Sequence, residues 1–98
     1  THPVVSAGEA LAKPRLDVYP NPGSDRIQVK LHLEKRAHVH WQVVDLLGQP
    51  VLQLPAQEVP EGESIQVMEI PGTTAGGIYW IRCSVEGQAP AVVRWVRQ

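Results

Sequence analysis

Hydrophobic and polar residues alternate along several short stretches of this chain. The alternation runs from Asp25 to Leu33, resumes from Ala37 to Val43, and appears again from Gly76 to Val85. Because successive side chains of a strand point to opposite faces of a sheet, a period of two predicts strands with one buried face each. We therefore expect Trp41 and Cys83, which are in phase with the hydrophobic positions, to point inward.

Short polar segments predict turns between these strands. Glu34-Lys35-Arg36 would join the first two as a hairpin and would place His32 opposite His38. Glu86-Gly87-Gln88 would join the third strand to a strand at Ala91–Arg97, with its glycine at positive φ. The C-terminal end of the chain is therefore also predicted to be a β-hairpin.

Weaker patterns predict three further strands, at Leu16–Tyr19, Pro50–Leu54 and Glu63–Pro71. In the last of these the hydrophobic residues change face near Val67, which predicts a β-bulge. The segment Pro55–Gly62 contains two prolines and two glutamates and is predicted to be a polar loop. Seven short strands at this spacing predict an all-β fold, an immunoglobulin-like, Greek-key β-sandwich of antiparallel sheets.

Two of the turns have informative chemistry. In Pro20-Asn21-Pro22-Gly23 the prolines lack N–H donors, which suits the edge of a sheet, while Asn21 and Gly23 adopt turn conformations readily. In Asp45-Leu46-Leu47-Gly48-Gln49 the Asp45 carboxylate can accept hydrogen bonds from backbone amides ahead of it, and Gly48 can enter the left-handed region.

Length and composition indicate one small domain. The chain has 98 residues, no Phe, nine Pro and eight Gly, which favours strands and turns over helices. Residues Thr1 to Pro14 have no sustained period, which predicts a flexible linker, with the folded domain at residues 15–98. No apolar run approaches the ~20 residues that cross a bilayer, and no signal peptide pattern is present, so we expect any export signal upstream.

Charge and candidate chemistry narrow the function. Nine basic and ten acidic side chains nearly cancel, which argues against nucleic acid as a partner. No Ser lies in a nucleophile-elbow motif, no Gly-rich loop precedes a helix, and Cys83 is expected to be buried away from a base. We expect no catalytic residues and no cofactor, so the chain is predicted not to be an enzyme.

His32, His38 and His40 share the outward face in this prediction. Three imidazoles on one face could bind zinc. However, no Asp or Glu lies on the predicted face to orient them, and a flat sheet would leave the site open to water. We interpret the three histidines as part of a solvated polar face and expect no metal.

The alternation does not decide the orientation of Trp95. The last strand is apolar on both faces, so Trp95 can point outward, like Trp80, or inward with Val93. In one interpretation a tryptophan completes the core. In the other, the terminal strand and its two arginines form a recognition surface that docks onto another protein by strand addition.

Four motifs occur in order between about Leu16 and Gln98. The first is Tyr19-Pro20-Asn21-Pro22, the second is the turn with Asp45 and Gly48, the third combines Gly77 and Tyr79, and the last is the basic, apolar tail at residues 93–98. Together they resemble the VYPNP, D..G..V, G.Y and tail motifs of the type A C-terminal sorting domain of the type IX secretion system of Bacteroidetes.

The resemblance implies a secretion signal. Such domains direct an attached cargo protein from the periplasm across the outer membrane, for attachment at the cell surface or release. The implied partners are an outer-membrane translocon, a shuttle protein and a cell-surface sortase that typically removes the domain. Residues 1–14 would then be the linker in which the cut falls, because an exposed tether is open to a protease.

We expect the final strand and tail to be the main recognised surface: Val93, Arg94, Trp95, Val96, Arg97 and Gln98. The same strand is the candidate edge for a dimer. The alternative function is a non-catalytic carbohydrate-binding or structural module of a secreted enzyme. A sugar platform would use Trp41, Trp80 or Trp95, so exposure of the indoles discriminates between the two functions.

Overall fold

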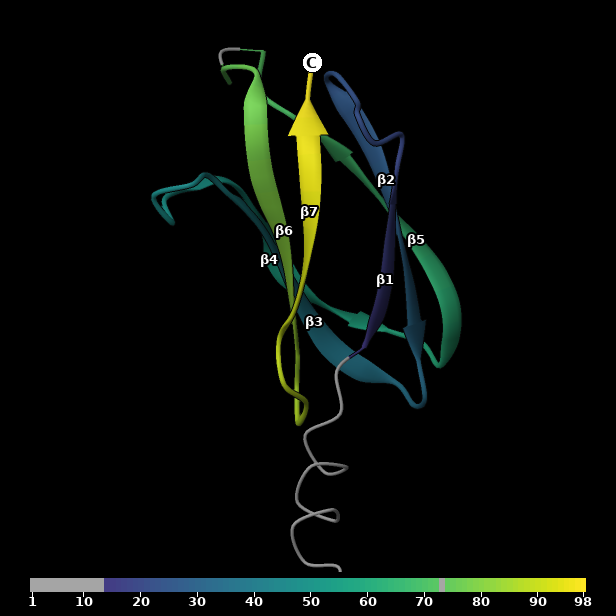
Figure 1. The fold of residues 1–98 in the computed structure, drawn as a ribbon. Helices are drawn as coiled ribbons and strands as arrows, with labels where there is room; N and C mark the ends of the chain where they lie inside the picture. The colour runs from purple at the N-terminus through teal and green to yellow at the C-terminus, as the bar shows by residue number, and fades with distance from the viewer. Residues whose placement is uncertain (1–13, 73) are drawn as a thin grey trace, which may run out of the picture.

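The computed structural model describes residues 14–72 and 74–98, and these residues form strands and no helix (Figure 1). The linker predicted for residues 1–14 lies outside the described residues except for Pro14, which is buried. In the described part of the chain, no helix is long and apolar enough to cross a membrane. The strands are β1 (Arg15–Tyr19), β2 (Arg26–Leu33), β3 (Ala37–Val44), β4 (Pro50–Val59), β5 (Gly62–Glu69), β6 (Gly77–Val85) and β7 (Ala91–Arg97).

The strands form two antiparallel sheets. The strand orders are β1-β2-β5 and β4-β3-β6-β7. Lettered A, B, C, C′, E, F and G along the chain, the strands give the immunoglobulin-like order A-B-E against C′-C-F-G. The predicted fold class, an all-β sandwich, is confirmed.

The segment from Glu34 to Arg36 crosses from one sheet to the other, so the predicted hairpin between β2 and β3 is wrong. β2 pairs with β1 and β5, whereas β3 pairs with β4 and β6. Each strand has one buried face, as its alternation predicts, but the two faces oppose each other across the core. Alternation identifies the buried face of a strand and does not identify its sheet. The β6–β7 hairpin is confirmed, with Gly87 at φ 79°.

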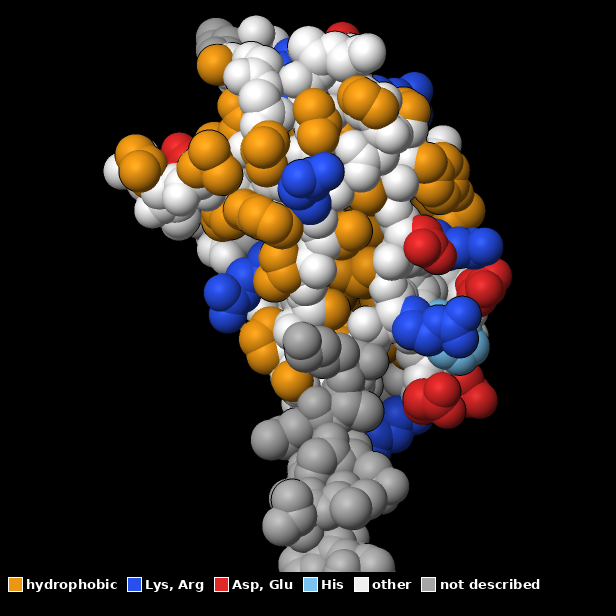
Figure 2. Space-filling view, in the orientation of Figure 1, with side chains coloured by type: hydrophobic (Ala, Val, Ile, Leu, Met, Phe, Trp, Pro, Cys, Tyr) orange, Lys and Arg blue, Asp and Glu red, His pale blue; other side chains and the backbone are white. Residues whose placement is uncertain are grey.

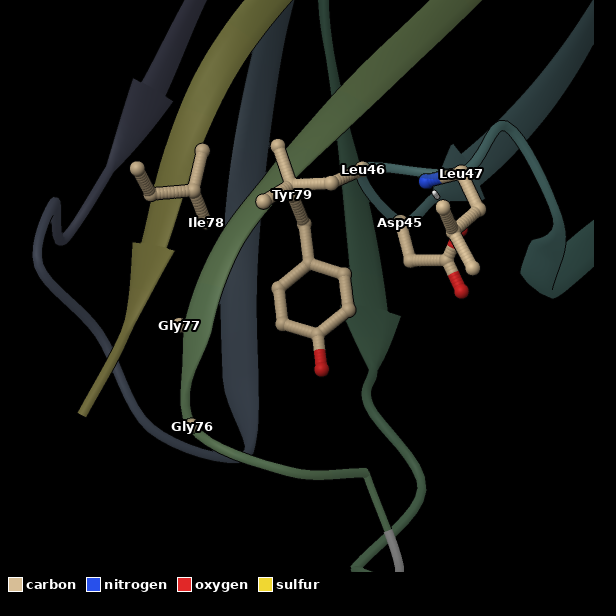
Figure 3. A pocket seen from close by; sticks show the side chains of 7 residues that line it. All are labelled: Asp45, Leu46, Leu47, Gly76, Gly77, Ile78 and Tyr79. Atoms are coloured by element: carbon tan, nitrogen blue, oxygen red, sulfur yellow. Dashed lines mark hydrogen bonds between the residues drawn. The ribbon is translucent and has the colours of Figure 1, made fainter.

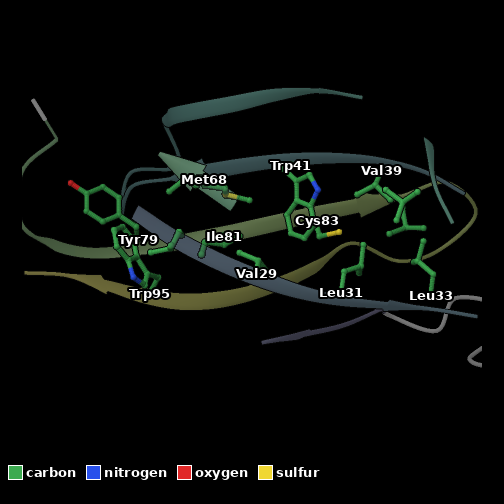
Figure 4. Close-up of a cluster of buried hydrophobic side chains, with 14 of the residues drawn as sticks. Val29, Leu31, Leu33, Val39, Trp41, Met68, Tyr79, Ile81, Cys83 and Trp95 are labelled. Carbon is green, nitrogen blue, oxygen red and sulfur yellow. The ribbon is translucent and has the colours of Figure 1, made fainter. Parts of the chain in front are cut away.

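The core lies between the inner faces of the two sheets (Figure 4). Cys83 is among its fully buried side chains, and burial raises the pKa of the thiol to about 12, so the thiol stays protonated at neutral pH. Trp41 is also buried, as predicted. Trp95 points inward and its ring lies 6.0 Å from that of Tyr79, tilted by 40°. The core interpretation of Trp95 is therefore correct.

The predicted loop at Pro55–Gly62 is wrong, because β4 continues to Val59 and β5 begins at Gly62. A register shift in the β3–β4 pairing lies opposite residues 54–57 and accommodates Pro55. β4 is an edge strand, where a missing N–H donor costs little. Of the two prolines that suggested a loop, Pro55 therefore lies at an irregularity within β4, and Pro60 lies between β4 and β5.

The β-bulge expected near Val67 is also wrong. Over the described strands β2 and β5, the register runs without a shift from the Arg26–Glu69 pair to the Leu33–Gly62 pair. Ile65 and Val67 point away from the core and are 54% and 37% exposed, whereas Met68 and Ile70 are buried. The change of face in the sequence is therefore produced by two hydrophobic residues on the outer surface.

Candidate functional site

The first three predicted motifs and the end of the fourth lie at one end of the sandwich, which we call the C-terminal pole (Figure 1). It consists of loop 20–25, turn 45–49, the start of β6 and residues 97–98. Antiparallel pairing explains the convergence, because β1, β3 and β7 all run toward this end while β2, β4 and β6 start there. β1 begins at the opposite end of the sandwich, where Arg15 pairs with His32 near the end of β2 (Figure 1).

Asn21 joins loop 20–25 to the outer edge of β7. Its side-chain amide donates to the Arg94 carbonyl oxygen at 3.0 Å, and its carbonyl oxygen accepts from the Val96 N–H at 3.0 Å. The amide thus replaces the backbone of a neighbouring strand, a role that needs one donor and one acceptor in the same group. Next to it, Gly23 donates to the Val96 carbonyl and accepts from the Gln98 N–H. The edge of β7 from Arg94 to Gln98 is therefore covered.

Position 23 requires glycine because there is no room for a side chain, a constraint that the predicted turn did not reveal. A Cβ atom there would lie 2.7 Å from the Pro20 carbonyl oxygen and 3.0 Å from Nε1 of Trp95. The same Trp95 Nε1 donates to the Pro20 carbonyl at 3.1 Å. The YPNPG segment therefore packs directly on the indole that β7 buries, which connects the first and last motifs of the sequence.

Asp45 organises turn 45–49, as predicted. Its Oδ1 accepts from the N–H groups of Leu47 and Gln49, each at 2.9 Å, and its backbone carbonyl accepts from Gly48. Gly48 has φ 84°, in the left-handed region that glycine tolerates. The ordered turn leaves Leu46 and Leu47 at its tip, 68% and 84% exposed.

Gly77 and Tyr79 form the start of β6. Gly77 has φ 142°, which disfavours any other residue. The Tyr79 ring is buried against Trp95, and its hydroxyl donates to the Ala75 carbonyl. The G.Y motif thus stabilises the backbone where the chain enters the sheet.

The six residues predicted for recognition divide into two groups. Trp95 is buried, and Arg97 donates from Nε to the Thr74 carbonyl at 3.0 Å and from its guanidinium to the Ser24 carbonyl. These two side chains hold the pole together. The other four are exposed or half-buried, and they are Val93, Arg94, Val96 and Gln98.

The three histidines do not form the predicted cluster. His32 lies on β2 in one sheet, whereas His38 and His40 lie on β3 in the other, so the pairing of His32 with His38 is wrong. His38 Nδ1 lies 3.2 Å from a carboxylate oxygen of Glu86, and this hydrogen bond lowers the pKa of Glu86. Among the described residues, no group of three metal-ligating side chains is present.

The fold and its contacts define the class of protein, which is a small immunoglobulin-like β-sandwich whose sequence motifs stabilise one pole. A family model, the secretion system C-terminal sorting domain, matches residues 17–96, and the chain belongs to this family. A search of the curated proteins finds no match to the chain.

Membership in the family establishes the general function. The domain is a C-terminal sorting signal for type IX secretion, so it interacts with the type IX machinery and accompanies export to the cell surface or the medium. The family acts in sorting and is in general non-catalytic.

Proposed function

We propose that the type IX machinery recognises this sorting signal at its C-terminal pole, mainly through β7 and the tail. The observation that supports the proposal is the exposure of Arg94 and Gln98 beside the motif loops, at the end away from Arg15. A cargo that precedes the sandwich would join it at the Arg15 end. Recognition at the other end avoids a clash with that cargo, whatever its size.

Within the tail, we assign recognition to the side chains of Arg94, Val96 and Gln98. Trp95 and Arg97 act indirectly, by fixing the strand that presents them. Because Asn21 and Gly23 already occupy the edge of β7 beyond Arg94, strand addition to β7 by a partner or by a second copy is confined to residues 91–93.

The remaining steps of the pathway follow the family. In this proposal the cargo passes through the periplasm, the translocon and the shuttle protein act on the folded sandwich, and a sortase cuts within residues 1–14. The chain itself performs no catalysis. The protonated, buried thiol of Cys83 supports that view, because a thiolate is the reactive form of cysteine.

The carbohydrate-binding alternative is less well supported. A sugar platform needs an indole face in water, but Trp41 and Trp95 are 1% and 0% exposed. Trp80 alone of the three candidates is half-buried rather than buried. A change of tryptophan fluorescence on addition of polysaccharide would favour the carbohydrate-binding function instead.

The experiment fuses residues 1–98 to an exported fluorescent reporter in a type IX-competent bacterium and in an isogenic strain without the translocon. We expect surface fluorescence only when both the chain and the translocon are present. If no fusion leaves the periplasm while an established type IX signal does, the proposed function is wrong.

Point variants test the role of the tail better than its deletion, because deletion of residues 93–98 removes the Trp95 indole from the core. Arg94→Glu reverses an exposed charge on β7, and Lys35→Glu makes the same reversal in the exposed segment between β2 and β3. We expect Arg94→Glu to reduce surface delivery and Lys35→Glu to leave it unchanged. Equal delivery of the two variants would contradict recognition at the tail.

A further inference from the structure

The outer face of the β4-β3-β6-β7 sheet is apolar near the C-terminal pole. Cross-strand pairing places Val44 beside Trp80 and Ile78 beside Val96, all pointing away from the core. Val92 lies on the same face of β7, beyond Arg94 and further from the pole, and is 53% exposed. Figure 2 shows hydrophobic side chains gathered over the upper parts of β6 and β7. We call these five residues the outer apolar face.

Two arginines interrupt this face without an acidic partner. Arg94 pairs with Trp80 across the strands, and Arg82 pairs with Val92, so both point to the same side as the hydrophobic residues. Neither arginine forms an ion pair with any described residue. The face therefore combines apolar surface with positive charge that nothing in the described sandwich neutralises.

The outer face of the other sheet differs in this respect. Arg26 forms an ion pair with Glu69 at 3.3 Å, and Lys30 forms one with Glu63 at 3.8 Å. Its exposed hydrophobic residues, Ile65 and Val67, lie next to Lys30 and Gln28. Charges that are paired within the sheet suit contact with water. On the β4-β3-β6-β7 sheet the paired charges, Arg36 with Glu58 and His38 with Glu86, lie at the end away from the C-terminal pole, so the contrast holds for the halves of the two outer faces nearer the pole.

Turn 45–49 extends the apolar surface beyond the sheet. Leu46 and Leu47 lie at its tip, and the hydrogen bonds to Asp45 hold the turn that presents them. A shallow cleft of ≈ 220 Å³ separates this turn from the start of β6 and is lined by both leucines and by Ile78 (Figure 3). Two large aliphatic side chains in water, on a turn ordered by its own hydrogen bonds, are typical of a preorganised docking element.

We propose that the outer apolar face, together with Leu46 and Leu47, docks onto a protein of the secretion machinery whose surface is apolar and carries carboxylates. This inference rests on the proposed function and extends the recognised surface from the tail to turn 45–49. Charge complementarity determines the occupant: Arg82 and Arg94 need acidic partners when their surroundings lose water. A second copy of the chain is a poor occupant, because a two-fold contact of this face with itself would enclose the arginines of both copies and would supply no carboxylate from the outer apolar face.

The test uses the reporter fusion of residues 1–98 and changes no residue of the tail. Leu46→Ser/Leu47→Ser removes the tip side chains and keeps the backbone amides that bind Asp45. Ile65→Thr/Val67→Thr is the matched control on the opposite face. We expect the leucine variant to reduce the rate of surface delivery at least about tenfold, since two aliphatic anchors are lost, and the control to match the parent.

A second pair of variants tests the charge. Arg82→Glu should reduce delivery more than Arg82→Gln, because only the former repels carboxylates on the partner. Thermal denaturation of each purified chain verifies folding. If the folded Leu46→Ser/Leu47→Ser and Arg82 variants are delivered like the parent, whereas Arg94→Glu is not, this inference is wrong and the proposed function stands. Loss of self-association in the leucine variant, with delivery unchanged, would identify a second copy as the occupant and overturn the inference.

Discussion

Replacement of Asn21 by Ala should destabilise the sandwich by detaching loop 20–25 from β7. The change removes two hydrogen bonds, one to the Arg94 carbonyl and one from the Val96 N–H, each 3.0 Å long. A hydrogen bond contributes about 0.5–1.5 kcal/mol net, so the loss is roughly 2 kcal/mol. In a domain of this size, 1 kcal/mol shifts Tm by about 4–8 °C, which predicts a decrease in Tm of roughly 8–16 °C.

Asn21→Asp distinguishes the effects of the two hydrogen bonds of the Asn21 side chain. The introduced carboxylate can still accept from the Val96 N–H, but its second oxygen faces the Arg94 carbonyl oxygen, which also accepts only. At neutral pH we therefore expect Asn21→Asp to be at least as destabilising as Asn21→Ala, although it preserves the shape of the side chain. A model in which Asn21 acts only by its turn propensity predicts little loss for Asp, because Asp also favours turns.

The assays are thermal and urea denaturation of the purified chain, both followed by tryptophan fluorescence. Trp95 is a suitable probe, because its Nε1 donates to the Pro20 carbonyl of the same loop. Ser24→Ala is the control, since within residues 14–72 and 74–98 that side chain bonds only to the exposed Asp25, and its loss should cost less than about 0.5 kcal/mol. If Asn21→Ala denatures at the same urea concentration as Ser24→Ala, the bridging role of Asn21 is wrong.

Three further predictions follow from single contacts. Gly23→Ala should lose about 1–3 kcal/mol of stability in urea, because its Cβ has no space, whereas Gly72→Ala, which meets nothing within 4 Å, should lose little. The Cys83 thiol, with its pKa raised to about 12, should react with an aromatic disulfide reagent at about pH 8 far more slowly in the folded chain than in denaturant; equal rates would contradict its burial. His38→Gln should raise the NMR titration midpoint of Glu86, because the hydrogen bond to the imidazole is the main cause that holds the pKa of Glu86 below its ordinary 4.5. The small stabilisation by this exposed pair is present above pH 4.5 and is lost as the pH falls through the lowered value. An unchanged midpoint would exclude the His38 side chain as the cause.

The pattern of residues determined the strands with one buried face and the local turns. β2, β3 and β6 follow their alternation because each buries every second side chain. The Asp45 turn is equally local, since its donors and acceptor lie within five consecutive residues. The family motifs could also be found in the sequence, because they are short, ordered along the chain and specific as a set.

The pairing partners of a strand and the contacts of its motif residues depended on residues that are distant in the sequence. The β2–β3 hairpin was predicted wrongly because a buried face can be covered either by a sheet neighbour or by the opposite sheet. The loop predicted from Pro55 and the β-bulge predicted near Val67 were wrong for a related reason. An edge strand tolerates a proline and an outer face tolerates hydrophobic residues, but the sequence alone does not reveal which strands are edges or which faces are outer.

For the candidate site, too, the sequence determined one part and the tertiary structure determined the other. The sequence by itself identified the motif residues at 19–22, 45–48 and 77–79 and the tail, because their residue types are unusual in combination. The tertiary structure decided their tasks: Asn21 and Gly23 cover the edge of β7, about 70 residues later in the chain, and Trp95 and Arg97 hold the pole rather than project from it. The physical reason is that hydrogen bonding and burial depend on which atoms the fold brings within 3 to 4 Å, and that proximity is fixed only when both sheets are packed.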